Sequence, residues 1–343
     1  MKAAGLTRLL TSGQLGIPFT HIEPLAVDGE GAFSLVYKAK CNVSGSTIAL
    51  KFERPNLAVD EPLRSAAFDR EASILEQLRA KSNVTQMSHS LATAEYQLKD
   101  PDYPETIRFR YFGLSFYPLT LLDLIRNHTH SFVDAMRVYR GIVKGMRQIH
   151  TEAICHRDLK PGNCFVMNGD ALVGDFGTAR RDQKSDNIGK GDMYKWWVWG
   201  DMRYVAPELF LGVTGFADFV RADFYSLGCV LFEICTNQIL ADLIDAALNK
   251  LDQANRHLAC RSSSQGRRLV ERIINDLETG GYLPEIGLQP PLPGRGTREL
   301  VNALFKQLCA FAPAKRLTDF DEVFRRTDII IDRALSESRS EGS

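Results

Sequence analysis

The sequence predicts an α+β protein with two lobes: a small antiparallel β-rich lobe with one main helix, then a larger, mostly helical lobe. Three observations lead to this fold class. Strand-like alternation dominates before Leu114, helical periodicity dominates after Pro118, and loops rich in polar residues lie near the start of the helical part. With 343 residues, the chain is long enough for each lobe to bury a core of its own.

The N-terminal part is expected to consist of strands and one helix. Residues 22–55 alternate β-branched and aromatic residues with glycines between them, which is typical of short strands. Two further strands are expected over 93–98 and 107–116, joined by a proline-rich turn. A helix is expected over 63–79, because apolar residues recur there at helical spacing. These residues are Leu63, Ala67, Ile74, Leu75 and Leu78.

After Pro118 the pattern is that of helices. One helix is expected to end at His150, with an apolar face toward the core. That face consists of Val133, Met136, Ile142, Val143, Met146 and Ile149. Short strands are expected around the polar loops at 156–177. Residues 236–300 carry serine, glycine and proline clusters, which predict helices separated by long loops.

This order of elements predicts the domain organisation. Residues 1–20 are expected to be an N-terminal extension, either a mobile tail or an extra helix on the small lobe; they also weakly resemble a transit peptide. Residues 21–115 are expected to form the N-lobe and residues 116–332 the C-lobe, with a hinge near Leu114–Pro118. Residues 333–343, rich in Ser, Glu, Arg and Gly, are expected to be a disordered tail.

The composition excludes several function classes. Lys+Arg and Asp+Glu both number 42, so a strongly basic body for nucleic acid or a membrane surface is not indicated. No apolar run reaches the ~20 residues of a membrane span. The seven cysteines form no C-x-x-C pair and no cluster with zinc spacing. They predict reduced thiols and a cytoplasmic location.

The polar residues that carry chemistry concentrate in one stretch. The run HRDLKPGN at 156–163 is followed by Asp175-Phe176-Gly177. Phosphoryl transfer needs this set: a carboxylate that orients a hydroxyl, a cation near the travelling phosphate, and an amide and a second carboxylate that hold magnesium. Pro161-Gly162 also reads as an ordinary surface turn. The joint occurrence of both motifs argues against an incidental turn.

These strings resemble the catalytic loop and the magnesium-binding loop of eukaryotic-type protein kinases. Further strings agree: Ala206-Pro207-Glu208 matches the end of the family's activation segment, and Arg316 matches the arginine that pairs with that glutamate. Asp223 matches the buried helix aspartate that holds the catalytic loop. The resemblance covers residues 22–330 and implies the bilobal kinase fold, with nucleotide bound by the N-lobe and catalysis in the C-lobe.

The resemblance also implies a role for each polar residue of the C-lobe, with ATP and Mg²⁺ as cofactors. Asp158 would orient the substrate hydroxyl and take its proton late. Lys160 would balance charge on the γ-phosphoryl oxygens. Asn163 and Asp175 would hold Mg²⁺ through hard oxygen ligands.

In the N-lobe the resemblance implies a nucleotide-binding surface. Gly29 and Gly31 would let the backbone lie close over the phosphates. Phe33 would shield the terminal phosphate, and Ser34 stands where the family has its third glycine. The apolar residues around the adenine would be Val36, Ala49 and, from the C-lobe, Phe165. 

Lys51, in the run Ile48-Ala49-Leu50-Lys51, matches the lysine that contacts the α/β-phosphates. A buried lysine needs a partner of opposite charge. Glu71 is the first choice for that partner and Glu76 the second.

Two features depart from the family's pattern. Asp201 stands where Ser/Thr kinases usually carry a threonine, and a second carboxylate near Asp158 is expected either to capture Lys160 or to raise the pKa of one acid. Lys160 still favours serine and threonine over tyrosine as acceptors. Trp196–Trp199 indicate either core packing or a docking surface for a regulatory protein partner.

Regulation is a further open point. Arg157 beside Asp158 indicates control by an anionic activation loop, because a phosphate pairs well with arginine. No serine or threonine follows Ser185 in the loop 178–205, however. Asp186, Asp192 or Asp201 is expected to supply a constant negative charge instead, which leads to the hypothesis of constitutive activity.

Three functions compete. The first is a protein kinase that moves the γ-phosphate of ATP to Ser or Thr hydroxyls of protein substrates. The second is a pseudokinase that binds ATP and regulates a partner; Asp201 and Ser34 favour it, but the Lys, Asp and Asn positions are intact. The third is a kinase of small molecules, against which the matches at Glu208 and Asp223 argue.

Overall fold

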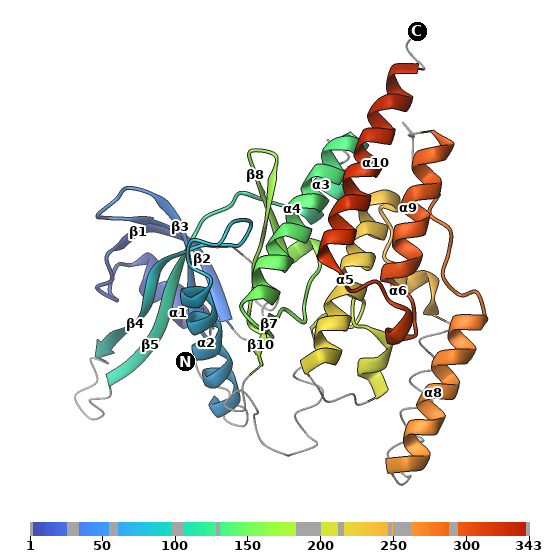
Figure 1. Ribbon diagram of the computed structural model, residues 1–343. Coiled ribbons are helices and arrows are strands. Elements are labelled where there is room, and N and C mark those ends of the chain that lie inside the picture. Colours follow the sequence, from blue (N-terminus) through green and yellow to red (C-terminus); the bar gives the residue numbers. More distant parts are fainter. Residues whose placement is uncertain are drawn as a thin grey trace. The chain divides into compact units, whose positions relative to one another are not determined.

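The structure, a computed structural model, divides into two compact units (Figure 1). It describes residues 3–25, 34–54, 61–97, 106–127, 131–182, 200–211, 216–245, 249, 263–287 and 294–340. The first unit comprises Met1–Ala80 with Thr85–Tyr117, and the second Lys81–Val84 with Pro118–Ser343. The chain passes between the units after Ala80, after Val84 and after Tyr117, and the last of these lies in the segment Leu114–Pro118 for which a hinge is predicted.

The first unit is built on one antiparallel sheet of five strands, as the alternation predicts. In sheet order these are β1 (Phe19–Pro24), β2 (Ser34–Cys41), β3 (Thr47–Glu53), β5 (Thr106–Ser115) and β4 (Met87–Gln97). Strand β4 begins at Met87 rather than at residue 93. Register shifts between Met87 and Ala92 interrupt its pairing with β5, and such bulges hide a strand's alternation from sequence patterns.

A short N-terminal helix, α1 (Ala3–Thr11), completes the core on one face of this sheet. Leu6 and Leu10 are buried among apolar residues of β2 and β3, including Tyr37 and Phe52. The Thr7 and Tyr37 hydroxyls are 2.9 Å apart, which joins the helix to β2. Of the two expectations for residues 1–20, the extra helix is confirmed for the described part, and the mobile tail is wrong there.

We expect Leu6→Ala to lower the free energy of unfolding by about 2–3 kcal/mol, because the deletion leaves a cavity under the sheet. Leu6 is fully buried, whereas Leu91 on β4 is 40% exposed. Chemical denaturation of the two leucine-to-alanine variants checks this, with Leu91→Ala expected to change stability by less than about 0.5 kcal/mol. Equal effects in the two variants would show that α1 does not contribute to the core.

The predicted helix over 63–79 is α2 (Glu61–Gln77). Phe68 on α2 packs against Phe112 on β5, with ring centroids 4.9 Å apart. Ile74 and Leu75 are buried, as the spacing predicts. This packing holds α2 against the sheet face opposite to α1. It thereby fixes where the polar residues of α2, such as Glu71, lie relative to the strands.

The second unit is mostly helical. The apolar face predicted for the helix ending near His150 lies on α4 (Phe132–Thr151), where five of its six residues are buried and Val133 is half-buried. Helices α5 (Phe216–Thr236) and α10 (Phe320–Ser340) pack against α4, and α9 (Arg295–Leu308) packs against α5 and α10. The segment 236–300 contains α6 (Leu240–Leu243), α8 (Ser263–Thr279) and the start of α9, as expected.

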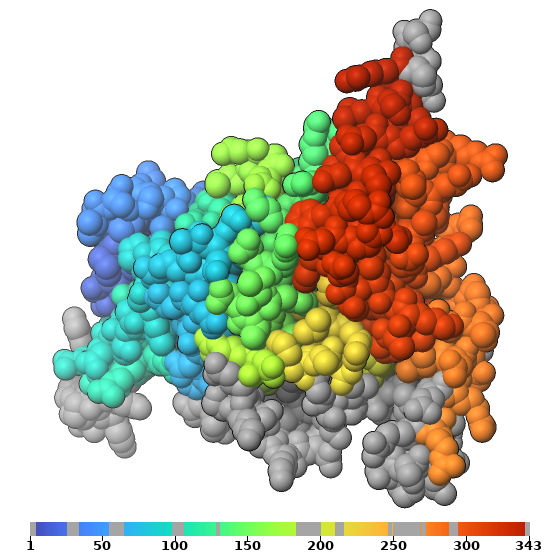
Figure 2. Space-filling view, in the orientation of Figure 1, coloured from blue at the N-terminus to red at the C-terminus, as the bar shows by residue number. Residues whose placement is uncertain are grey.

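Helix α10 corrects the expectation of a disordered tail from residue 333. The helix continues to Ser340, and Figures 1 and 2 show it (red) along α4 (green) and α9 (orange). Ala334 is buried, and Glu337 accepts hydrogen bonds from Thr297 (2.6 Å) and Arg333 (2.7 Å). The polar composition of this segment is typical of disordered tails, and for that reason the prediction failed. The segment is helical because ion pairs at i,i+4 spacing and an apolar stripe stabilise it.

Short strands flank the two polar loops of this unit, at 156–163 and 174–179, and hold them in position. The strands β7 (Ile154–Cys155) and β10 (Arg180–Arg181) pair, and β6 (Leu119–Thr120), β8 (Cys164–Met167) and β9 (Asp170–Val173) form a small sheet. The loops at 156–163 and 174–179 lie between these strands. Among the described helices, none is long and apolar enough to cross a bilayer.

Candidate active site

The residues predicted to act together fall into both units. Ser34, Val36, Ala49, Lys51 and Glu71 belong to the first unit. The residues of the second unit are Asp158, Lys160, Asn163, Phe165 and Asp175. Gly29, Gly31, Phe33 and Trp196–Trp199 lie outside the described residues, as do Ser185, Asp186 and Asp192.

In the first unit, the predicted nucleotide-binding residues share one face of the sheet. The side chains of Ile48, Leu50 and Phe52 point into the core under α1, so Ala49 and Lys51 face the other way. Val36 on β2 lies opposite Lys51 in the register of the two strands. The apolar residues predicted for the adenine thus lie next to the cation predicted for the phosphates.

The buried lysine is paired. Lys51 Nζ donates to Glu71 Oε1 at 2.6 Å, and both side chains are buried. Glu76, the second choice, instead accepts from Arg79 and from Ser90. The pair forms because α2 packs its Glu71 face on the sheet, and it holds the ammonium group in position at the surface that Val36 and Ala49 share.

In the second unit, Asp223 on α5 shapes the loop that carries Asp158. Its two carboxylate oxygens accept the backbone N–H groups of His156 and Arg157, both at 2.8 Å, as predicted. His150 Nε2 donates to the same carboxylate at 2.8 Å. Burial alone would raise the pKa of Asp223, but its hydrogen bonds to His150 and to the backbone N–H of Arg157 oppose this, and the pKa lies below its usual value. Arg157 accordingly sits at a positive φ of 69°.

The Asp158 carboxylate is held from three sides. The backbone N–H of Asp201 donates to Oδ1 at 2.6 Å, and Asn163 Nδ2 donates to Oδ2 at 3.0 Å. Lys160 Nζ lies 3.2 Å from Oδ2. Burial raises the pKa of Asp158, Lys160 opposes this, Asp175 adds to it, and the net result is a raised pKa. A carboxylate fixed in this way is oriented for a proton and is a better base than an exposed one.

The residues predicted to bind magnesium meet the chemical requirements of that ion. Asn163 Nδ2 donates both to the backbone carbonyl and to the carboxylate of Asp158, which leaves the amide oxygen as its metal-binding atom. The Gly174 N–H donates to the Asn163 carbonyl at 2.9 Å, so the loop with Asp175 lies against Asn163. One carboxylate and one amide oxygen, completed by substrate phosphates and water, is the kind of set that Mg²⁺ prefers.

Asp201 acts only partly as expected. Lys160 Nζ lies 3.2 Å from Asp158 Oδ2 and 3.6 Å from Asp201 Oδ2, so the second carboxylate shares the lysine with Asp158 rather than capturing it. The pKa of Asp158 is raised, but by burial and by Asp175, whereas the backbone N–H of Asp201 lowers it. The pull of Asp201 on Lys160 is limited because its carboxylate also accepts two hydrogen bonds from the Arg203 side chain.

Gly200 is required by the close approach of its backbone to Asp158. A Cβ atom built on Gly200 would lie 2.5 and 2.6 Å from the Cβ and Cγ of Asp158. Such a contact displaces the carboxylate, and we expect Gly200→Ala to lower turnover by about 10²-fold. At Gly287, which lies elsewhere in the unit, the same change meets open space.

The matched pair Gly200→Ala and Gly287→Ala, compared by steady-state kinetics and thermal melting, tests this. We expect Gly287→Ala to behave as wild type in both assays. Wild-type turnover in Gly200→Ala would show that Asp158 tolerates displacement.

Two contacts of the site were not predicted. Arg157 stacks over the Phe219 ring at 4.2 Å and donates to the Thr178 carbonyl, so its guanidinium is built into the unit. No sequence pattern marks Phe219. The second contact is the pair of hydrogen bonds that the Arg203 guanidinium donates to the Asp201 carboxylate. In the sequence, this pair is indicated only by two opposite charges two residues apart, next to Gly200.

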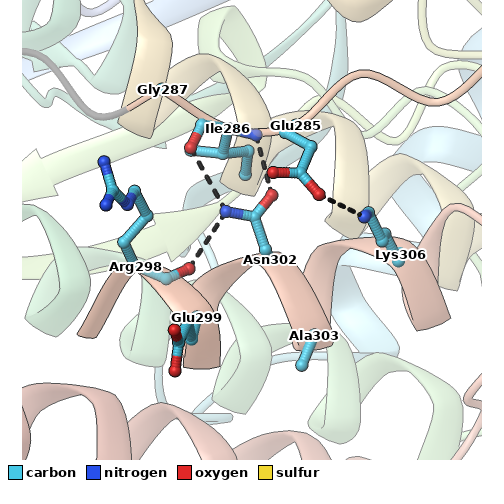
Figure 3. Close-up of a pocket in the computed structure, with 8 residues that line it drawn as sticks. All are labelled: Glu285, Ile286, Gly287, Arg298, Glu299, Asn302, Ala303 and Lys306. Carbon is cyan, nitrogen blue, oxygen red and sulfur yellow. Dashed lines mark hydrogen bonds and ion pairs between the residues drawn. The ribbon is translucent and has the colours of Figure 1, made fainter. Parts of the chain in front are cut away.

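A pocket of about 670 Å³ lies elsewhere in the second unit, between residues 285–287 and α9 (Figure 3). Its polar groups largely satisfy one another. Asn302 binds the N–H and the carbonyl of Ile286 at 2.7 and 3.2 Å, and Lys306 pairs with Glu285 at 2.9 Å. None of the residues predicted for catalysis lines this pocket.

Comparisons with known proteins agree with this geometry. A family model described as the protein kinase domain matches residues 23–327. The chain is 24% identical over 279 residues to serine/threonine-protein kinase PLK4 of Nematostella vectensis, covering 77% of this chain and 25% of that protein. It is 26% identical over 310 residues to mitogen-activated protein kinase 4a of Physcomitrium patens, covering 86% and 73%. A probable serine/threonine-protein kinase PknB of Bifidobacterium longum is 31% identical over 214 residues, covering 61% and 29%.

Proposed function

Because this chain belongs to the protein kinase family, we propose that it transfers the γ-phosphate of ATP to serine and threonine hydroxyls of proteins, with Asp158 as the catalytic base. The observation that carries the proposal is the fixed carboxylate of Asp158, held by the Asp201 N–H, Asn163 and Lys160. Its raised pKa supports late proton transfer from the hydroxyl.

The other residues support the same reaction. Lys160 lies close enough to Asp158 to balance charge that develops on the phosphoryl oxygens. Asn163 and Asp175 would hold Mg²⁺, which when bound neutralises phosphate charge. In the first unit, Glu71 holds Lys51 ready for the α/β-phosphates. Ser34, Val36 and Ala49, on β2 and β3, would line the nucleotide in the first unit. The role of Phe165 on β8 at the adenine stays a prediction from the family resemblance.

The acceptor and the compartment are parts of the same proposal. Lys160 in the catalytic loop favours Ser and Thr acceptors, as do the names of two relatives that are called serine/threonine-protein kinases. The six described cysteines are all buried and unpaired, which favours a reducing compartment such as the cytoplasm. The chain spans only a quarter of the first relative, so substrates and partners of the relatives are not carried over.

Incubation with γ-labelled ATP, Mg²⁺ and a generic basic protein, followed by phosphoamino-acid analysis, tests the proposal. We expect label on serine and threonine, and none with Asp175→Ala. Nucleotide binding without transfer in the wild type would overturn it in favour of a pseudokinase. Label on tyrosine alone would overturn the acceptor class.

A further inference from the structure

Asp201 places a second negative charge beside the proposed base, and Arg203 balances it. Arg203 Nε lies 2.9 Å from Asp201 Oδ1, and Nη2 lies 2.6 Å from Oδ2. The backbone N–H of Arg203 donates to Oδ1 as well, at 3.2 Å. Both oxygens are thus engaged by one guanidinium in the bidentate geometry that binds a carboxylate most strongly.

We propose that Arg203 is a positioning residue of the phosphoryl-transfer site: its two hydrogen bonds to Asp201 compete with Lys160 for that carboxylate, so that Lys160 stays nearer to Asp158, and they steady the turn whose N–H binds Asp158. This inference rests on the proposed function, in which Lys160 balances the charge on the transferred phosphoryl group. Arg203 itself touches neither Asp158 nor Lys160 among the contacts of the described residues, so it acts through Asp201.

The charges near Lys160 show why these hydrogen bonds are needed. Lys160 has two carboxylates within 3.6 Å, those of Asp158 and Asp201. Burial opposes ionisation of Asp201, but its hydrogen bonds to Arg203, together with the charge of Lys160, lower its pKa. Asp201 is therefore charged at neutral pH. Among the described residues, Lys160 is the other cation that pairs with this carboxylate, so it is the one expected to compensate the charge without Arg203.

The same hydrogen bonds fix the backbone. Asp201 donates its N–H to Asp158 Oδ1 while its carbonyl accepts the N–H of Tyr204 at 2.9 Å. The side chain of Asp201 then closes the turn onto Arg203, so all of its polar groups are engaged. Arg203 is 53% exposed, so the pair is held without burying an unpaired charge.

Exposure also allows another role, direct binding of an acidic substrate, and kinetics separates the two. A positioning role predicts a lower kcat with an unchanged KM for the protein substrate. We expect Arg203→Gln to lower kcat about tenfold, in the range found for residues that share a hydrogen-bond network. Arg295→Gln is the matched control, because Arg295 forms a comparable exposed pair with Glu299 on α9.

The double variant supplies the decisive comparison. Asp201→Asn removes the charge that Arg203 balances, so adding Arg203→Gln to it is expected to lower kcat by less than about twofold. Equal losses with and without the Asp201 charge would overturn the inference, as would a change in KM alone. Thermal melting of each variant excludes general unfolding as the cause.

A titration decides the inference independently of catalysis. In Arg203→Gln we expect the carboxyl pKa of Asp201, followed by NMR, to rise relative to the wild type, with no change in Arg295→Gln. An unchanged pKa would overturn the inference. A wild-type protein that transfers no phosphate contradicts the proposed function instead, and the two failures are thereby distinguished.

Discussion

Asp158→Asn is expected to lower phosphoryl transfer by about 10²–10⁴-fold, because the variant loses the carboxylate proposed to take the hydroxyl proton. The structure adds a second cause. Oδ1 of Asp158 accepts the Asp201 N–H and Oδ2 accepts from Asn163, so both oxygens face donors. An asparagine amide must turn its NH₂ group toward one of these donors, and that hydrogen bond is lost.

The measurement is single-turnover transfer from labelled ATP, with nucleotide binding followed separately. We expect Asp158→Asn to bind ATP like the wild type, since the surface proposed to bind the nucleotide around Lys51 and Glu71 lies in the first unit and does not include Asp158. Asp332→Asn, at an exposed position of α10, is the control for loss of one carboxylate and is expected to be fully active. Transfer by Asp158→Asn within about threefold of wild type would remove Asp158 from the base role.

The parts of the site that depend on local sequence were predicted best. Asp223 was predicted to hold the catalytic loop, and both of its backbone hydrogen bonds are present. The choice of Glu71 over Glu76 also held, because the helical period places Glu71 on the face that meets the sheet. In both cases the residue lies on a regular helix, so its position in the motif determines which group it contacts.

The parts that depend on packing were not predicted. The burial of Leu6 under the sheet requires knowing which strands cover α1, and the helical end of α10 depends on Thr297, forty residues away in sequence. The hydrogen bonds of Arg203 to Asp201 limit the expected capture of Lys160 by this second carboxylate, and these bonds were not predicted. A turn can direct a side chain either toward or away from its neighbours, and spacing alone does not distinguish the two.

Arg316→Met is expected to cost about 3–5 kcal/mol of unfolding free energy, because it leaves Glu208 as an unpaired buried carboxylate. The two side chains are 0% and 2% exposed, and they form two parallel hydrogen bonds of 2.5 and 2.9 Å, as the motif match predicted. Arg316 also donates to the carbonyls of Ala310 and Arg221. Methionine fills the space of the arginine stem but satisfies none of these acceptors.

Thermal melting checks the size of the effect, which corresponds to a Tm lowered by roughly 10 °C. Arg325→Met breaks a pair with Glu322 in which the arginine is 60% exposed, and it is expected to change stability by less than about 1 kcal/mol.

The double variant Glu208→Leu with Arg316→Met removes both charges. Its loss of unfolding free energy is expected to be less than the sum of the losses in the two single variants, since no unpaired carboxylate remains. It does not regain wild-type stability, because the carbonyls of Ala310 and Arg221 still lack their donor. If Arg316→Met and Arg325→Met have the same Tm, the buried ion pair does not stabilise the segment at Glu208.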